Sequence, residues 1–276
     1  MPVYLKPYFL SILAAFLYVL PTKSSAQGVT GPTGAQAWMM GGASAATADV
    51  WSAANNPAVM CLLPTNQLGL YTEQRFMEKN LKLANISGVL KTKWLYAGGY
   101  IHYFGYEAFN QQRLGFSLGK KLADNISLGI QLNYLATNIR EYGNSRAWVL
   151  GAGILYKPIP KLTTVITFFN INQARYNQTL TERIPATARL GVSYELSAKV
   201  LTTAETEQTL NQKTVFRGGL RYQLHEVIAL AMGAANNPVY YTFGVGLKMK
   251  QLKLDMASGF HEVLGFTPHL SISFPL

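Results

Sequence analysis

The closing stretch of the chain, residues 266–274 (FTPHLSISF), alternates apolar and polar side chains. Leu270, Ile272 and Phe274 fall on one face of an extended strand, and the polar residues fall on the other. Similar alternation recurs in stretches of about ten residues back to residue 67. No segment after the N-terminus is long and apolar enough to be a membrane helix, which needs about 20 residues. The pattern therefore predicts an all-β transmembrane barrel.

The connections between the alternating segments follow a pattern of their own. Short connections alternate with longer ones, as periplasmic turns alternate with external loops in outer-membrane barrels. Single-chain bacterial barrels also have an even number of strands. We predict an antiparallel barrel of fourteen strands, at residues 67–75, 80–91, 94–104, 112–122, 125–138, 146–157, 161–171, 184–196, 198–207, 213–223, 226–235, 239–249, 251–261 and 266–274.

The N-terminus has the features of an export signal. Lys6 precedes an apolar run at residues 8–20, and small residues follow the run. The run is shorter than the roughly 20 residues of a spanning helix, which favours a cleavable signal over a membrane anchor. The predicted organisation is a signal peptide at 1–26, an N-terminal plug or hatch segment at 27–65, and an outer-membrane barrel at 66–276.

The segment 27–65 differs from the rest of the chain. It is rich in Gly, Ala, Ser and Thr, and it lacks the alternation of a barrel wall. A helix is predicted over residues 45–54, with Asn56 and Pro57 ending it. We expect this segment to fold into the lumen or to cap the periplasmic mouth of the barrel.

Composition supports a surface that faces lipid. Charged residues make up 13% of the chain, against roughly 25% in soluble domains. The formal net charge is +11, but the basic residues are spread over turns and strands rather than gathered in one patch, which argues against a nucleic-acid partner. The sole cysteine, Cys61, has no intramolecular partner and is expected to be a small buried residue.

Alternation in the later strands places charges of both signs on the inward face. Opposite charges on neighbouring strands can pair across a sheet. Such a ladder could fill and stiffen the barrel or bind a substrate, and an ion pore is a weaker alternative. The predicted luminal charge ladder consists of Arg189, Glu195, Glu205, Glu207, Arg217, Arg221, Lys253 and Asp255.

No catalytic signature occurs in the chain. The four histidines are scattered, and although His261 and His269 could approach one another, a pair of histidines without a carboxylate or thiolate ligand specifies a metal only weakly. Neither GxSxG nor HExxH is present, nor is a glycine-rich phosphate loop. We expect a protein that is not an enzyme and has no cofactor and no metal.

Residues 41–63 read GGASAATADVWSAANNPAVMCLL, with a small-residue run before Asp49, Trp-Ser-Ala and Asn-Pro-Ala. This pattern resembles the N-terminal region of the FadL-like outer-membrane transporters, and it is most similar to the PorV and PorQ barrels of Bacteroidota, which are linked to type IX secretion. The resemblance implies a fourteen-stranded outer-membrane barrel. It also implies that Asn55, Asn56, Pro57 and Ala58 shape a luminal hatch, although the same residues could simply end a helix and turn into the first strand.

Two functions remain open. In the first, the barrel is a passive transporter for a hydrophobic or amphipathic small molecule, with a lateral opening at Gly98 and Gly99; these glycines could equally make room for the plug. In the second, it is a non-transporting partner in a type IX-like secretion complex that binds through the external loops 140–145 and 172–183. Outer-membrane lipid is a partner in both. So is the assembly machinery, since the last strand with Phe274 resembles its recognition signal.

Overall fold

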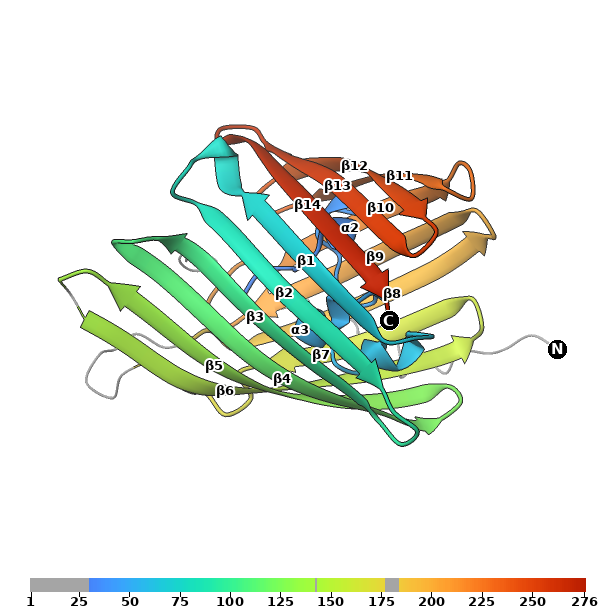
Figure 1. Cartoon of the computed structure of the whole chain (residues 1–276), viewed down its shortest axis with the longest axis horizontal. Coiled ribbons are helices and arrows are strands. Elements are labelled where there is room, and N and C mark those ends of the chain that lie inside the picture. Colours follow the sequence, from blue (N-terminus) through green and yellow to red (C-terminus); the bar gives the residue numbers. More distant parts are fainter. Residues whose placement is uncertain (1–29, 142, 177–183) are drawn as a thin grey trace.

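The computed structural model describes residues 30–141, 143–176 and 184–276. Within them, fourteen strands form one closed antiparallel barrel in which every strand pairs with its sequence neighbours and β1 pairs with β14 (Figure 1). The strands are β1 (Gln67–Gln74), β2 (Lys82–Lys91), β3 (Tyr96–Tyr106), β4 (Phe109–Ala123), β5 (Ile126–Ile139), β6 (Gly143–Ile159), β7 (Leu162–Phe169), β8 (Thr187–Ser197), β9 (Val200–Thr209), β10 (Val215–Gln223), β11 (Ile228–Ala235), β12 (Tyr240–Met249), β13 (Leu252–His261) and β14 (Gly265–Pro275).

The predicted barrel and its strand count are confirmed, and the predicted strand bounds lie within a few residues of the observed ones. The predicted signal peptide at 1–26 lies outside the described residues. No helix of the described residues is long and apolar enough to cross a membrane.

Side chains on the outer face are large and apolar. On β5, Leu128, Ile130 and Leu132 are exposed, whereas the alternating residues Gln131 and Asn133 are buried in the lumen. The facing predicted from alternation is therefore confirmed for this strand. Closure gives every strand two neighbours, although residues 143–150 at the start of β6 pair with β5 alone. A closed barrel with an apolar outer face has the architecture of a membrane-spanning protein.

The first strands alternate less clearly in sequence because their lumen side is partly apolar. On β2, Leu83 and Val89 point inward and are buried, while Ile86 and Leu90 are exposed on the outer face. The pairing of β2 with both neighbours runs without a register shift. Apolar residues on both faces therefore reflect an apolar lumen and not a slipped strand.

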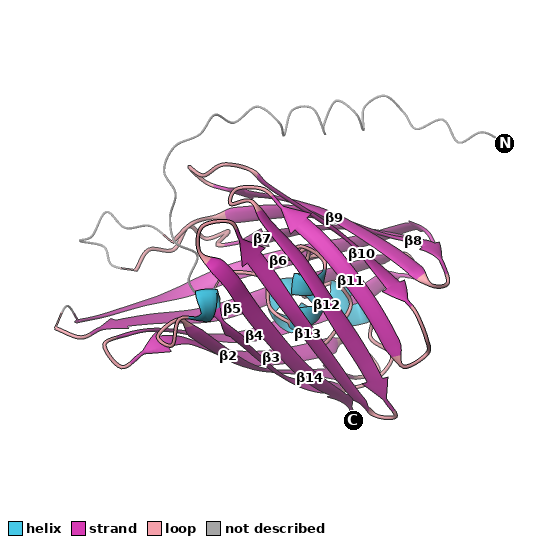
Figure 2. Cartoon of the chain, turned by 90° about the horizontal axis from the view of Figure 1, so that it is seen from above, coloured by secondary structure: helices cyan, strands magenta, loops and turns pink. Residues whose placement is uncertain are grey.

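The lumen is filled by the N-terminal segment (Figures 1 and 2). It contains α2 (Ala35–Met39), α3 (Ser52–Asn55) and the 3₁₀ helix η1 (Val59–Leu62), and nearly all of its residues from 32 to 61 are buried. A further 3₁₀ helix, η2 (Arg75–Met77), follows β1. We call residues 30–65 the plug. Its side chains Met39, Trp51 and Met60 share one hydrophobic cluster with wall residues such as Val89 and Tyr100.

The predicted helix over residues 45–54 is wrong. Only Ser52–Asn55 is helical, and the stretch before it forms turns. The backbone groups of this stretch bond to side chains instead: the Trp51 N–H donates to Asp49 Oδ1, the Thr47 carbonyl accepts from the Ser52 hydroxyl, and the Ala45 carbonyl accepts from Asn56 Nδ2. Backbone donors and acceptors engaged in this way are not available for helical i to i−4 bonds.

Candidate functional site

The Asn-Asn-Pro-Ala motif lies inside the barrel and holds the plug together. Asn55 bonds both backbone groups of Thr33: its Oδ1 accepts from the Thr33 N–H at 3.0 Å and its Nδ2 donates to the carbonyl at 2.8 Å. Asn56 donates to the Ala45 carbonyl at 3.0 Å and accepts from the Ala58 N–H at 3.1 Å. The two amides therefore cross-link three parts of the plug. Whether the motif acts as a hatch stays a prediction.

Glycines of the wall let the plug come close. A Cβ atom at Gly129 on β5 would collide with Pro57 and Ala58, and one at Gly98 on β3 would lie 2.6 Å from Met60 Sδ and 2.8 Å from Ala53 Cβ. Only glycine leaves enough room at such a contact. The plug backbone therefore packs directly on the wall at Gly129, and plug side chains pack on it at Gly98.

Half of the predicted charge ladder forms one buried cluster. Arg189 Nε lies 2.7 Å from Glu207, and Arg217 Nη1 lies 3.1 Å from both Glu205 and Glu207. These four residues, on β8, β9 and β10, are named here the arginine–glutamate cluster. The three on β9 and β10 are at most 5% exposed. Buried charges of this kind are tolerated only when they are paired and hydrogen-bonded.

The arginine–glutamate cluster also holds the plug. Glu205 Oε2 accepts from the backbone N–H groups of Ser44 at 2.8 Å and Ala45 at 2.7 Å. Arg189 Nη2 donates to the Thr30 carbonyl at 3.2 Å. One carboxylate thus joins a wall arginine to two plug amides, and the cluster fastens the plug to one side of the barrel.

The other predicted ladder residues lie apart from this cluster. Lys253 Nζ lies 3.0 Å from Asp255, and it also contacts Gln36 on α2. Arg221 donates to Gln223 at 3.2 Å, and Glu195 is exposed at the end of β8 that leads into the short turn before β9. The eight residues share the inward face by alternation, but they do not form a continuous ladder.

Asp49 places a further carboxylate in the plug, outside the membrane-spanning strands. Burial raises the pKa of the Asp49 carboxyl to about 7, Lys253 opposes this rise, and Asp255 adds to it. Its Oδ2 atom is buried with no hydrogen-bond partner. Between about pH 4 and about pH 7, the Asp49 carboxyl therefore keeps its proton in the folded protein, whereas in the unfolded chain, with an aspartate pKa of about 4, it would release it.

This proton gives a pH dependence with a definite sign. Because the folded-state pKa is raised, thermal stability should fall as the pH rises from about 4 to about 7. The Asp49→Asn variant lacks the titrating group, so its melting temperature should change less between about pH 5 and about pH 8 than that of the wild type. Circular dichroism in detergent measures both. An equal change in the two proteins would contradict the prediction.

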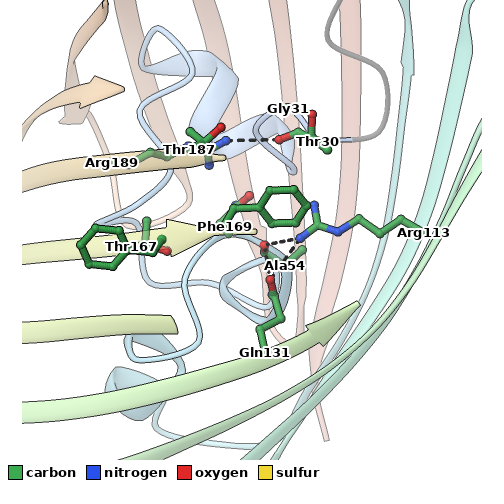
Figure 3. Close-up of a pocket in the computed structure, with 11 residues that line it drawn as sticks. Thr30, Gly31, Ala54, Arg113, Gln131, Thr167, Phe169, Thr187 and Arg189 are labelled. Atoms are coloured by element: carbon green, nitrogen blue, oxygen red, sulfur yellow. Dashed lines mark hydrogen bonds between the residues drawn. The ribbon is translucent and has the colours of Figure 1, made fainter. Parts of the chain in front are cut away.

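A small cavity remains between the plug and the wall (Figure 3). Arg113 on β4 reaches into it beside Phe169, and Arg189 borders it from β8. The Arg113 guanidinium donates to Asn133 at 2.8 Å and to Gln131 at 3.1 Å, and its carbon lies 5.0 Å from the Phe169 ring centre. The cavity offers solvent about 30 Å³, room for a few waters at most, whereas pockets for drug-sized ligands measure about 300 to 1,000 Å³. This structure shows the plugged state of the barrel.

Two parts of the lumen escaped prediction. Alternation along residues 112–122 would have placed Arg113 inward. A second network joins Tyr71, Glu73 and His269: the Tyr71 hydroxyl lies 2.5 Å from Glu73 Oε2 and 2.9 Å from His269 Nδ1, and Trp38 stacks on the imidazole at 4.5 Å.

His261 does not join His269 in this network, and its ring accepts from backbone N–H groups of the neighbouring turn. Among the described residues, no group of three or more His, Cys, Asp or Glu side chains could hold a metal.

The sequence matches no family model and no curated protein. Solved structures with a similar fold include the monoaromatic hydrocarbon channel CymD, with a TM-score of 0.69 and 14% identity over 89% of this chain and 97% of that one. The toluene transporter TodX of Pseudomonas putida has a TM-score of 0.68 and 11% identity, over 87% and 97%. A FadL homologue of Pseudomonas aeruginosa has a TM-score of 0.64 and 13% identity, over 91% and 99%.

The chain has the fold that CymD, TodX and the FadL homologue share. At these identities the likeness extends to the fold alone. Two of these similar structures are transport proteins by name, a hydrocarbon channel and a toluene transporter.

Within this barrel, Gly98 and Gly99 have opposite surroundings. Gly98 faces the plug, and a Cβ atom at Gly99 would meet nothing within 4 Å. The pairing of β3 with β2 and β4 runs through both glycines without a register shift. Gly98 therefore makes room for the plug, and a lateral opening beside Gly99 stays a prediction.

Proposed function

We propose that the protein is an outer-membrane channel for passive passage of hydrophobic or amphipathic small molecules and not an enzyme. The observation that carries this proposal is the plugged fourteen-stranded barrel in the fold of hydrocarbon channels. Under the usual arrangement of such barrels, the short turns face the periplasm and the longer connections face outward.

The plug must move for anything larger than water to pass, because its residues 32–61 are nearly all buried inside the barrel and the cavity beside Arg113 has room for only a few waters. The lumen beside β1, β2 and β3 has apolar and aromatic side chains that pack against the plug, among them Tyr71, Leu83 and Phe104, between buried polar ones such as Glu73 and Asn85. Moving the plug away from them would expose a path with both apolar and polar side chains. This lining favours a hydrophobic or amphipathic ligand over a small ion.

A secretion-complex subunit is the second candidate. It rests on residues 41–63, whose pattern is similar to PorV and PorQ barrels of Bacteroidota. Its contacts would come from the loops 140–145 and 172–183, parts of which lie outside the described residues. Shortening both loops would release a bound protein partner if this candidate is right, and would leave uptake of a small molecule unchanged if the channel proposal is right.

Uptake into cells tests the channel proposal. A strain that expresses the protein should accumulate labelled toluene or a labelled medium-chain fatty acid faster than the same strain without it. Native mass spectrometry of gently extracted protein gives an independent readout, since a retained hydrophobic molecule supports a channel. Equal uptake in both strains, together with a stoichiometric protein partner, would reject the proposal.

The lateral opening has its own test at Gly99. Gly99→Leu adds a side chain on the outer face beside Gly88 of β2, where the structure has space, so the barrel should assemble normally. If ligand leaves sideways here, uptake should fall severalfold while the melting temperature stays unchanged. Ala152→Leu, an outward-facing change on β6, is the matched control. Unchanged uptake in Gly99→Leu would exclude an exit at this position.

A further inference from the structure

Lysines gather at one end of the barrel. The short connections after β2, β4, β6, β8 and β12 each carry lysine in the turn or in the adjoining strand ends. The acidic residues of this end are Asp124, Glu195, Glu226 and Asp255, and Asp255 is already paired with Lys253. The other lysines of this end are Lys91, Lys93, Lys120, Lys121, Lys157, Lys161, Lys199, Lys248 and Lys250.

The opposite end has no such excess. Basic and acidic residues are mixed there, and some of them pair, as in Arg75 with Glu73 at 2.6 Å and Arg140 with Glu107 at 3.7 Å. The net positive charge of the described chain therefore lies mainly at the short-turn end. Outer-face and turn positions at that end are occupied by Lys93, Lys120, Lys161, Lys199 and Lys250, named here the lysine ring, all of them exposed.

Each lysine of the ring has a large apolar neighbour that is also exposed. Trp94 is 76% exposed, and the Lys93 ammonium lies 5.4 Å from its ring centre. The corresponding neighbours in the other connections are Leu122, Ile159, Leu196 and Met249. Apolar or aromatic side chains in the acyl region, with lysine ammonium groups at headgroup level, are the arrangement that a membrane interface favours.

We propose that the lysine ring binds the phosphate groups of anionic phospholipids in the leaflet that meets the short-turn end. The inference rests on the proposed membrane location. An acidic soluble partner could neutralise the lysines, but it would leave the adjoining apolar side chains in water. An anionic phospholipid binds both the lysines and the apolar side chains, because its phosphate pairs with the ammonium groups and its acyl chains cover Trp94 and the other apolar neighbours. The closed sheet keeps the five lysines in fixed relative positions.

Lipid retention tests the proposal without requiring transport. The full chain is placed in nanodiscs that contain equal amounts of phosphatidylglycerol and phosphatidylcholine with the same acyl chains, and native mass spectrometry counts the lipids that stay bound. The wild type should retain severalfold more phosphatidylglycerol than phosphatidylcholine. Replacing the five ring lysines by Gln should abolish the preference, and high salt should weaken it in the wild type.

The matched control changes four basic residues of the opposite end to Gln. They are Lys79, Lys82, Arg140 and Lys213, and each of them is exposed. It should keep the wild-type preference. Heat-dependent gel mobility confirms that each variant is a closed barrel. Equal retention of both lipids by the wild type, or an unchanged preference in the ring variant, would overturn the proposal. If the wild type prefers phosphatidylglycerol but takes up no ligand, the proposed channel function is contradicted and the lipid site is not. If the wild type does not enter the nanodisc, the proposed membrane location is contradicted.

Discussion

Oxidation of a Ser127→Cys variant should abolish ligand uptake. Cys61 lies on η1 of the plug, and Ser127 on β5 of the wall is close enough to affect the pKa of its thiol. A cysteine at position 127 has nearly the size of the serine that it replaces, so the thiols should meet without rebuilding the lumen. The resulting disulfide would tie the plug to the wall. If ligand passes only when the plug moves, uptake should fall to the level of cells that lack the protein.

Controls for this lock are available within the same chain. Burial raises the pKa of the Cys61 thiol, so a catalyst such as copper phenanthroline is needed to form the bond. Reduction should restore uptake. In the variant that combines Cys61→Ser with Ser127→Cys, the oxidant should leave uptake unchanged. Full uptake through a barrel whose disulfide is proved by mass spectrometry would show that ligand bypasses the plug.

Replacing Glu205 by Ala should have the opposite effect and loosen the plug. The change removes one carboxylate from Arg217 and leaves the buried N–H groups of Ser44 and Ala45 without their acceptor. Breaking a buried ion pair typically costs about 3 to 5 kcal/mol, and each unsatisfied buried donor costs about 1 to 3 kcal/mol. The barrel wall is held by its own strand pairing, so we expect the loss to fall on the docking of the plug.

Limited proteolysis and conductance measure that docking. The Glu205→Ala plug should be cleaved at least about tenfold faster than the wild-type plug, which corresponds to about 1.4 kcal/mol or more of lost docking free energy. Planar bilayers should show larger or more frequent openings. Glu195→Ala is the matched control, because it removes an exposed inward-facing carboxylate from β8. Wild-type proteolysis and conductance in Glu205→Ala would mean that the arginine–glutamate cluster does not hold the plug.

The barrel wall could be predicted because its signal is local. A strand with lipid on one side and a polar lumen on the other must alternate with a period of two, as residues 127–139 do. The turns that end each strand are also local. Strand count, direction and facing therefore followed from short windows of sequence, and the mixed pattern of β2 was ambiguous only because its lumen side is apolar as well.

The plug contacts could not be predicted in this way. Glu205 accepts from the N–H groups of Ser44 and Ala45, which lie 161 and 160 residues away in the sequence. The helix predicted over residues 45–54 does not form, because side chains of the folded plug bond the Ala45 and Thr47 carbonyls that it would use. Alternation predicted that eight charged side chains share the inward face, but it did not predict which of them form ion pairs. Pairing depends on strand register, on position along the barrel axis and on where the plug lies. Sequence alone determined the strands of the wall and their facing, since each strand contacts only lipid, the lumen and its neighbouring strands. The tertiary structure decided the inside, because those contacts exist only after closure brings distant strands around the plug.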